Sequence, residues 1–446
     1  MHVFPQLREL ERKYSAEMVV IGVHSAKFTA EKATNSVRKA ILRYEIGHPV
    51  VNDHDFDVWQ RYAVRAWPTL MFIDPQGKVV GKHEGEIVLD AFDEFIGEMV
   101  ARFDEQGSID RRPLSFKLER DKEEERQLSF PGKVLADASS DRLFIADSNH
   151  NRVVIASLRG EVLDVVGTGE KGLVDGGYNS ARFDDPQGMA LDDDSLYVAD
   201  TKNHAVRRID LGSKEVETLA GTGEQASMFH AGGSGLSTAL NSPWDLALND
   251  GNIYIAMAGF HQLWRLDLET QEVVPHAGSG RERIEDGPLD IAALAQPSGI
   301  VTDGSKLYFT DSETSAVRTA DMSRSGRVAT IVGQHLFTFG DVDGVGDEVR
   351  LQHPLGIDLH DGVLYITDTY NNKVKTVFPA TRDTVTLLGT GSPGHKDGPG
   401  LSAEFDEPGG LSIADGMLFI ADTNNHAIRT ADLASCEVAT LELNGI

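Results

Sequence analysis

Residues 196–207 read Leu-Tyr-Val-Ala-Asp-Thr-Lys-Asn-His-Ala-Val-Arg. An apolar and aromatic run ends in Asp-Thr, and a second apolar run follows the Asn-His pair. This pattern predicts two short β-strands joined by a polar loop. Matching stretches occupy residues 364–375 and 418–429, so the pattern belongs to a repeat.

The repeat has a nearly fixed period. Each of six copies opens with a proline, and successive opening prolines are 54 to 57 residues apart. One small sheet cannot bury both of its faces, so a period built from short strands and turns indicates sheets arranged in a ring. We therefore expect six four-stranded blades, with the second blade's strands at residues 188–191, 196–199, 206–210 and 216–219. Residues 441–446 are expected to complete the last strand of the sixth blade. The opening prolines are Pro131, Pro186, Pro243, Pro297, Pro354 and Pro408.

The first hundred residues have a different pattern, in which helical and strand periodicities alternate. The predicted helices lie near residues 2–14, 29–44, 56–62 and 89–103, and the predicted strands near 19–23, 49–51, 69–74 and 79–81. We expect the strand at 19–23 to be buried. The sequence thus predicts an α/β domain (1–103), a charged linker (104–127) and an all-β six-bladed propeller (128–446).

Composition limits the classes of partner and the redox chemistry. The net charge of −28 repels phosphate backbones and anionic lipid, so we expect neither nucleic acid nor membrane as a partner. Cys436 is the only cysteine, which excludes an internal disulfide, a Cys-x-x-Cys pair and a thiolate zinc site within this sequence. A single thiol suits a reducing compartment, and we expect a cytoplasmic protein. No cofactor is expected.

The first block carries one specific motif. Residues 64–74 read Val-Arg-Ala-Trp-Pro-Thr-Leu-Met-Phe-Ile-Asp, and Gly-Lys-Val-Val follows at 77–80. This stretch resembles the thioredoxin-like fold, in which the proline before Thr is cis and lies beside the redox site. The resemblance implies a cis Pro68 and a remnant substrate groove at Trp67, Pro68 and Thr69. The alternative is a structural turn beside a core strand.

The same resemblance places the family's Cys-x-x-Cys pair and the central strand of its sheet immediately before Met1. We therefore expect open sheet edges in this block and a natural start that has been misassigned or trimmed. Without a thiolate to attack a disulfide, the block as written is expected to be redox-inactive.

Residues 128–446 resemble NHL-repeat β-propellers, and the two blocks together resemble the thioredoxin-like, NHL-repeat-containing protein family. The strands of each blade are lettered a to d from the centre outward. Because successive strands run in opposite directions, the b–c loops and the long d–a loops lie on the same face, which we call the loop face. Polar or long loops on a rigid scaffold are frequent binding sites. The candidate residues there are Asp147, His150, Asp200, His204, Trp244, Phe260, His261, Trp264, Asp311, Asp368, Asn372, Asp422 and His426.

These candidates also have a structural interpretation, because Asp and Asn side chains hold turns by bonding nearby backbone amides. A column of basic residues on strand c is available to pair with the loop aspartates: Arg207, Arg318, Lys375 and Arg429. The third repeat departs from the pattern, with Met257 in place of Asp and Trp264 in the basic column. Its aromatic residues form either a contact patch for a partner or a locally repacked core.

Three functions remain open from the sequence. The first is an interaction protein whose loop face binds a protein or a small molecule and whose thioredoxin-like domain is redox-inactive. The second is a thiol–disulfide oxidoreductase whose Cys-x-x-Cys lies upstream of Met1. The third is a metal-dependent propeller enzyme, since some NHL-type propellers hold zinc with His ligands in a lyase site. No blade offers three convergent ligands, and we expect no metal.

Overall fold

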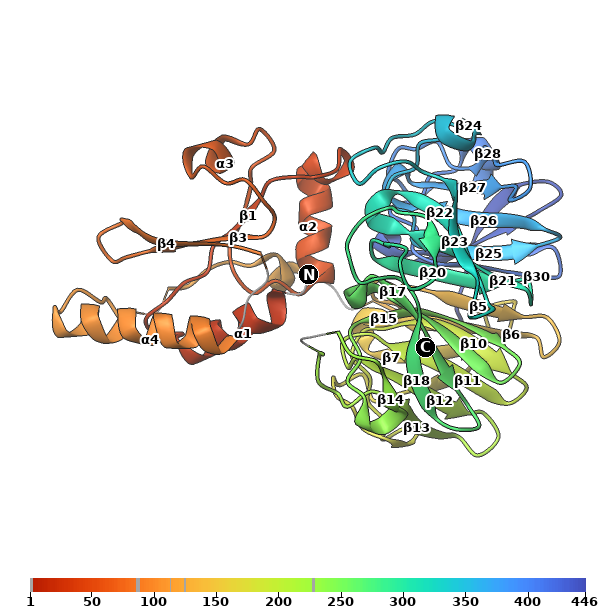
Figure 1. Ribbon diagram of the computed structural model, residues 1–446, viewed down its shortest axis with the longest axis horizontal. Helices are drawn as coiled ribbons and strands as arrows, with labels where there is room; N and C mark the ends of the chain where they lie inside the picture. The colour runs from red at the N-terminus through yellow and green to blue at the C-terminus, as the bar shows by residue number, and fades with distance from the viewer. Residues whose placement is uncertain (1–2, 86–88, 113, 124–125, 227–228) are drawn as a thin grey trace. The chain divides into compact units, whose positions relative to one another are not determined.

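The computed structural model describes residues 3–85, 89–112, 114–123, 126–226 and 229–446. The chain divides into two compact units, residues 1–125 and 126–446, each considered by itself below (Figure 1). The division falls within the predicted charged linker.

The first unit follows the predicted order of helices and strands. Its longer elements are α1 (Phe4–Lys13), β1 (Gly22–His24), α2 (Thr34–Arg43), β2 (Val50–Asn52), α3 (Asp57–Arg61), β3 (Thr69–Ile73), β4 (Val79–Glu84) and α4 (Leu89–Glu105). Its small core lies where α1 meets α4, and the buried side chains there are Leu10, Tyr14, Phe92 and Ile96.

The strands of this unit form two separate pairs. Strand β1 pairs with β2 in parallel, and β3 pairs with β4 antiparallel. Among the described residues no strand lies between β1 and β3, so the predicted open edges are confirmed. The predicted burial of residues 19–23 is wrong. Val19, Ile21 and Val23 are exposed, and β1 itself pairs with β2 alone among the described strands.

The second unit is the predicted propeller, and each blade is an antiparallel meander. Blade one comprises β5 (Val134–Asp137), β6 (Arg142–Asp147), β7 (Arg152–Ala156) and β8 (Val162–Val166). Blade two comprises β10 (Pro186–Asp192), β11 (Ser195–Asp200), β12 (Ala205–Asp210) and β13 (Glu215–Ala220). Blade three comprises β15 (Pro243–Asn249), β16 (Asn252–Met257), β17 (Gln262–Asp267) and β18 (Glu272–Ala277).

Blades four to six repeat this arrangement. Blade four comprises β20 (Pro297–Thr302), β21 (Lys306–Asp311), β22 (Ala316–Asp321) and β23 (Arg327–Val332). Blade five comprises β25 (Ile357–His360), β26 (Val363–Asp368), β27 (Lys373–Val377) and β28 (Asp383–Leu388). Blade six comprises β30 (Leu411–Ala414), β31 (Met417–Asp422), β32 (Ala427–Asp432) and β33 (Glu437–Leu441).

The six innermost strands close a ring, because each contacts the innermost strand of both neighbouring blades, and β30 contacts β5. The apolar cores lie between blades, as in the cluster that joins Phe144 and Val153 of blade one to Leu196 and Val198 of blade two. Every sheet therefore buries its faces against its neighbours, as the repeat predicted.

Short segments protect the outer edges of the blades. In blades two to six the preceding d–a loop adds a two-residue strand beside strand d: β9 (Gly176–Gly177), β14 (Gly233–Ser234), β19 (Gly287–Pro288), β24 (Gly344–Val345) and β29 (Gly398–Pro399). An uncovered edge is prone to pair with another chain, and these segments shorten it.

Blade one receives its edge segment from the other end of the propeller. The backbone N–H of Val162 donates to the Asn444 carbonyl (2.9 Å), and the N–H of Asn444 donates to the Gly160 carbonyl (2.9 Å). The sequence predicted that residues 441–446 would complete blade six, which is wrong beyond Leu441. The last residues cross to blade one, where Leu443 is buried and helps close the ring.

Candidate functional site

The aspartates of the loop face are structural anchors with no exposed surface. Asp147, Asp200, Asp311, Asp368 and Asp422 are fully buried at the ends of their b strands. One carboxylate oxygen of each accepts a backbone N–H from the segment that leads into strand a of the same blade, as from Asp184 to Asp200 (2.8 Å). The motif therefore holds in place the segment through which the chain enters strand a of the same blade.

The basic column pairs with these aspartates, as the sequence suggested. Arg207 Nη1 donates to Asp200 (2.8 Å), and its Nη2 donates to Asp175 of the d–a loop (2.8 Å). Arg318 and Arg429 repeat this geometry, and Lys375 takes the place of arginine in blade five. Each fully buried cation thus joins a b–c loop to a d–a loop inside the protein.

Burial works against ionisation of these carboxyl groups. It raises the pKa of Asp200, Asp368 and Asp422 to about 6, while the neighbouring Arg or Lys charge and the donated hydrogen bonds act in the opposite direction. Because every one of these carboxylates has a cationic partner within the fold, none is positioned as a free acid or base on the surface.

The fifth residue of each loop motif joins one blade to the next. Its side chain accepts the backbone N–H just before strand a of the following blade, as from Ser242 to His204 Nδ1 (3.0 Å) and from Phe130 to His426 Nδ1 (3.1 Å). The six acceptors are Asn151, His204, His261, Ser315, Asn372 and His426, and all have a left-handed backbone. The ring of bonds is complete, and the sixth closes blade six on blade one.

A second set of bonds lies beside this ring. The hydroxyl that follows each buried aspartate donates to the carbonyl of the next blade's opening proline, as from Thr201 to Pro243 (2.7 Å). Ser148, Ser312, Thr369 and Thr423 do the same, whereas blade three has Ala258 at this position. The Asp-Thr-x-Asn-His motif is therefore engaged mainly in holding loops and blades together.

Sequence reasoning missed two members of this ring. It chose His150 in blade one, but His150 Nδ1 contacts Asp147 of its own loop (2.9 Å), and Asn151 reaches the next blade. It also passed over Ser315 in blade four. Counting four residues onward from each Asp, and from Met257 in blade three, would have located all six.

Blade three replaces the ion pair with an apolar set. Met257 and Trp264 are fully buried, and Phe260 is nearly so. The Trp264 ring lies 5.5 Å from that of Phe260 and 5.3 Å from that of His230, and its Nε1 donates to Gln262 (3.0 Å). Their burial agrees with the repacked-core interpretation and leaves Phe260 and Trp264 little surface for a partner. Trp244 is half-buried at the start of strand a.

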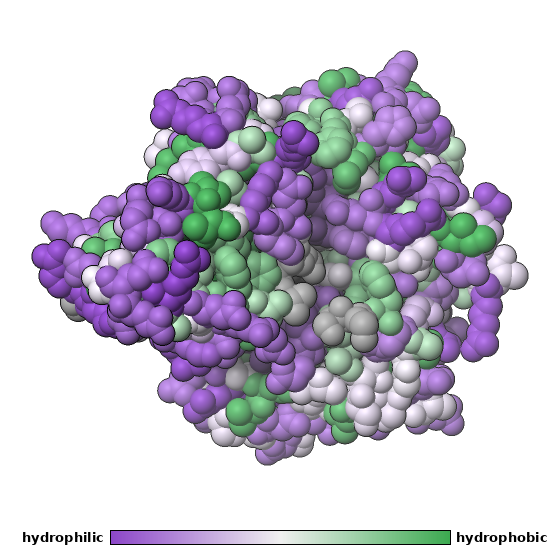
Figure 2. Space-filling view, turned by 60° about the vertical axis from the view of Figure 1, so that its left-hand side comes forward, coloured by the Kyte–Doolittle hydropathy of each residue, from purple (hydrophilic) through white to green (hydrophobic). Residues whose placement is uncertain are grey.

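Among its polar residues, the loop face also exposes several large apolar side chains. In the d–a loops the side chains of Phe229 and Phe337 are 58% and 66% exposed, and those of Val174 and Val342 are also exposed. Phe229 lies against the buried Phe260 (5.3 Å between ring centroids), so it extends the blade-three cluster to the surface. Figure 2 shows a mainly hydrophilic surface on which apolar residues gather in small separate groups.

The Trp67–Pro68 peptide bond in the first unit is cis, as the resemblance implied. Trp67 is 47% exposed, its Nε1 donates to the Ser25 carbonyl (2.8 Å), and its ring lies 4.4 Å from that of Trp59. Thr69 donates its hydroxyl to the Ala66 carbonyl (2.7 Å). Of the three predicted residues, Trp67 is therefore the exposed one, and the sequence of this unit contains no cysteine.

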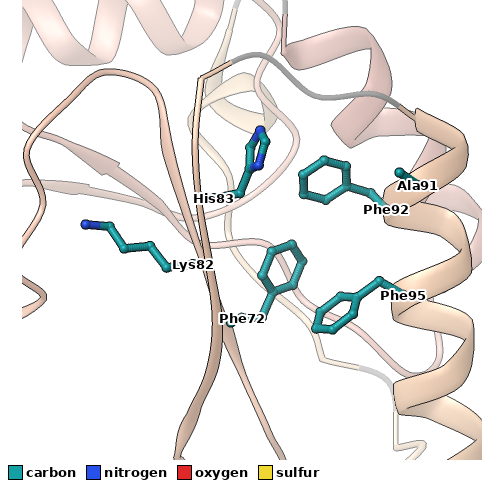
Figure 3. A pocket seen from close by; sticks show the side chains of 7 residues that line it. Phe72, Lys82, His83, Ala91, Phe92 and Phe95 are labelled. Atoms are coloured by element: carbon teal, nitrogen blue, oxygen red, sulfur yellow. The ribbon is translucent and has the colours of Figure 1, made fainter.

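An apolar pocket of about 340 Å³ lies between β4 and α4 of the same unit. Its lining includes the rings of Phe72, Phe92 and Phe95, with His83 edge-on to Phe92 (4.9 Å) (Figure 3). Lys82 extends away from the pocket and donates to the Ala63 carbonyl (2.9 Å).

Within the described ranges, no three His, Cys, Asp or Glu side chains are grouped so as to hold a metal ion. No helix in those same ranges is both long and apolar enough to cross a bilayer.

Comparisons with known proteins cover both units. A thioredoxin-like family model matches residues 1–79, and an NHL-repeat model matches residues 183–209. The chain is 42% identical to Protein SUPPRESSOR OF QUENCHING 1, chloroplastic, of Arabidopsis thaliana, over all of this chain and 44% of that protein. It is 37% identical to human NHL repeat-containing protein 2, over 99% of this chain and 66% of that protein.

The chain therefore spans less than half of the plant relative and about two thirds of the human one. Among solved structures, an auxiliary nutrient binding protein from Bacteroides thetaiotaomicron superposes with a TM-score of 0.50 at 15% identity, covering 71% of this chain and 70% of that one. That likeness concerns the propeller fold alone.

Proposed function

Because this chain belongs to the proteins that join a thioredoxin-like domain to an NHL-repeat propeller, and is homologous to NHL repeat-containing protein 2, we propose that it is an interaction scaffold. Its propeller binds a protein partner through the d–a loops of the loop face. Its thioredoxin-like domain contributes a docking surface and performs no dithiol–disulfide exchange with its own residues.

One observation carries this proposal. The polar motif of the loop face is engaged inside the protein, whereas Phe229 and Phe337 place exposed rings on long loops of a rigid ring. Exposed apolar side chains on such loops favour contact with another protein. The net charge of −28 further favours a partner that carries basic residues around an apolar centre.

The test compares two double variants of the full chain as affinity baits. Phe229→Ser with Phe337→Ser alters the loop face. Leu163→Ser with Val385→Ser alters side chains of similar exposure on the outermost strands of blades one and five. Quantitative mass spectrometry should find proteins that the loop variant loses and the outer-strand variant keeps. Equal losses with the two variants would contradict the assignment to the loop face.

A second candidate function is thiol–disulfide exchange that uses a Cys-x-x-Cys pair on polypeptide outside these 446 residues. The cis Trp67–Pro68 bond with its exposed indole and the thioredoxin-like match favour it. The intact mass and N-terminal sequence of the protein from its natural source decide between the two. An additional Cys-x-x-Cys segment, with insulin reductase activity, would support the redox function.

A further inference from the structure

The third residue of each blade's opening tripeptide forms a ring around the propeller's centre. Four blades have glycine there, blade one has Lys133 and blade three has Asp245. Of these six positions, only Lys133 and Asp245 therefore have side chains, and their charges are opposite. The four glycines are Gly188, Gly299, Gly356 and Gly410.

Lys133 reaches across this ring. Its Nζ donates to Asp245 Oδ2 of blade three (3.0 Å), to the Ser298 carbonyl of blade four (3.0 Å) and to the Leu355 carbonyl before strand a of blade five (2.7 Å). The blades that neighbour blade one are two and six, so these contacts span the centre. Lys133 is 4% exposed and Asp245 is 8% exposed.

The glycines leave the space that this pair fills. A Cβ on Gly188 would lie 1.9 Å from Asp245 Oδ1, and a Cβ on Gly410 would lie 2.6 Å from Lys133 Cδ. Neither contact is compatible with an ordinary side chain. The same Cβ atoms would also lie 2.4 Å from Asp245 Cα and 2.8 Å from Lys133 Cα, so glycine is required here both by this pair and by the close approach of the backbones.

We propose that the centre of the propeller is an ammonium-binding site, formed by the Asp245 carboxylate and the carbonyls of Ser298 and Leu355, which the chain occupies with its own Lys133. An ammonium group has three N–H donors, and the site supplies three acceptors. Because Lys133 occupies this site itself, the three acceptors are satisfied within the propeller.

The test empties the site and offers it a primary amine. Lys133→Gly gives blade one the residue that four other blades have, and Lys133→Met keeps the stem in place without a charge. Both variants leave Asp245 buried without its cation, so the propeller's Tm should fall by about 5–15 °C. n-Butylammonium should restore the Tm of the Gly variant in a saturable manner and leave the Met variant unchanged, because the Met stem occupies the path.

Three controls make the outcome specific. Tetramethylammonium, which has no N–H, should not restore the Gly variant at equal ionic strength. Adding Asp245→Asn to Lys133→Gly should abolish the butylammonium effect. An unchanged Tm for the Gly variant, or equal Tm shifts by both cations in every variant, would overturn the proposal.

If the Lys133→Gly variant does not fold, the proposal is tested in the Lys133→Met variant instead. There Asp245→Asn should raise the Tm, because it removes the unpaired charge, whereas in the presence of Lys133 it should lower it. The same sign in both backgrounds would overturn the proposal.

Discussion

The buried Arg207–Asp200 pair of blade two allows a direct test of how the loop motif works. Arg207→Met removes the cation from a carboxylate that is fully buried and still accepts bonds from the Asp184 amide and from Asn203. The Arg182 carbonyl also loses its bond from Arg207, and the Val174 carbonyl loses one of its two donors, keeping the N–H of Arg182. Breaking one side of a buried pair costs about 3–5 kcal/mol.

Removing the charge on the other side should recover part of this loss. Asp200→Asn alone leaves a buried guanidinium with a weakened acceptor and should cost about 1–3 kcal/mol. On the Arg207→Met background the same change removes an unpaired buried carboxylate and should be neutral or stabilising. The expected coupling energy is at least about 1 kcal/mol.

The assay is calorimetric unfolding of the propeller transition in the four proteins of the cycle. Lys214→Met is the matched control, because the Lys214–Asp164 pair has the same charges and the same 2.7–2.8 Å separation but lies in solvent. Its cost should stay within about 1 kcal/mol. Losses from Arg207→Met and Asp200→Asn that add within about 0.5 kcal/mol would refute the reasoning.

Two further predictions concern contacts between neighbouring blades. Asp358 accepts the amides of Leu359 and Ile413 (2.8 Å each), and burial raises its pKa to about 6 from the usual 3.8. The folded state therefore holds the proton more tightly, so this group's contribution to stability is lost as the pH rises from about 4 to 6. The Tm of Asp358→Asn relative to the parent should accordingly rise over that range, and a constant difference would contradict the raised pKa. Leu443→Ala should cost about 2–5 kcal/mol in calorimetry, because Leu443 is buried in the cluster that closes blade one, whereas Leu401→Ala, at a 64% exposed position, should cost less than about 0.5 kcal/mol. Equal costs for the two leucines would show that the C-terminal segment does not hold the ring.

The repeat predicted the propeller well because its signal is periodic and local. Strand alternation, turn residues and the opening prolines recur six times, so the strands of blade two came within two residues of their observed bounds. The cis Trp67–Pro68 bond was implied by the resemblance. Pairing between Arg207 and Asp200 was also inferred, since both positions recur at a constant offset.

What the sequence did not show depends on contacts between distant residues. The crossing of residues 442–446 to blade one has no local signature, since Leu443 resembles any residue of an outer strand. The Lys133–Asp245 contact joins positions 112 residues apart in two blades that are not neighbours. Burial of residues 19–23 was expected from their apolar character, but exposure depends on which strands are paired beside them.

Amide hydrogen exchange at the six blade junctions tests most directly whether the loop motif is an internal frame. The amides concerned donate to the ring of acceptor side chains and belong to Phe130, Asp185, Ser242, Gln296, His353 and Glu407. All six should exchange only through unfolding of the whole propeller, at rates that match the central b strands. If these six amides instead exchanged at rates typical of open loops, the motif would be free to bind a ligand. That result would contradict this account.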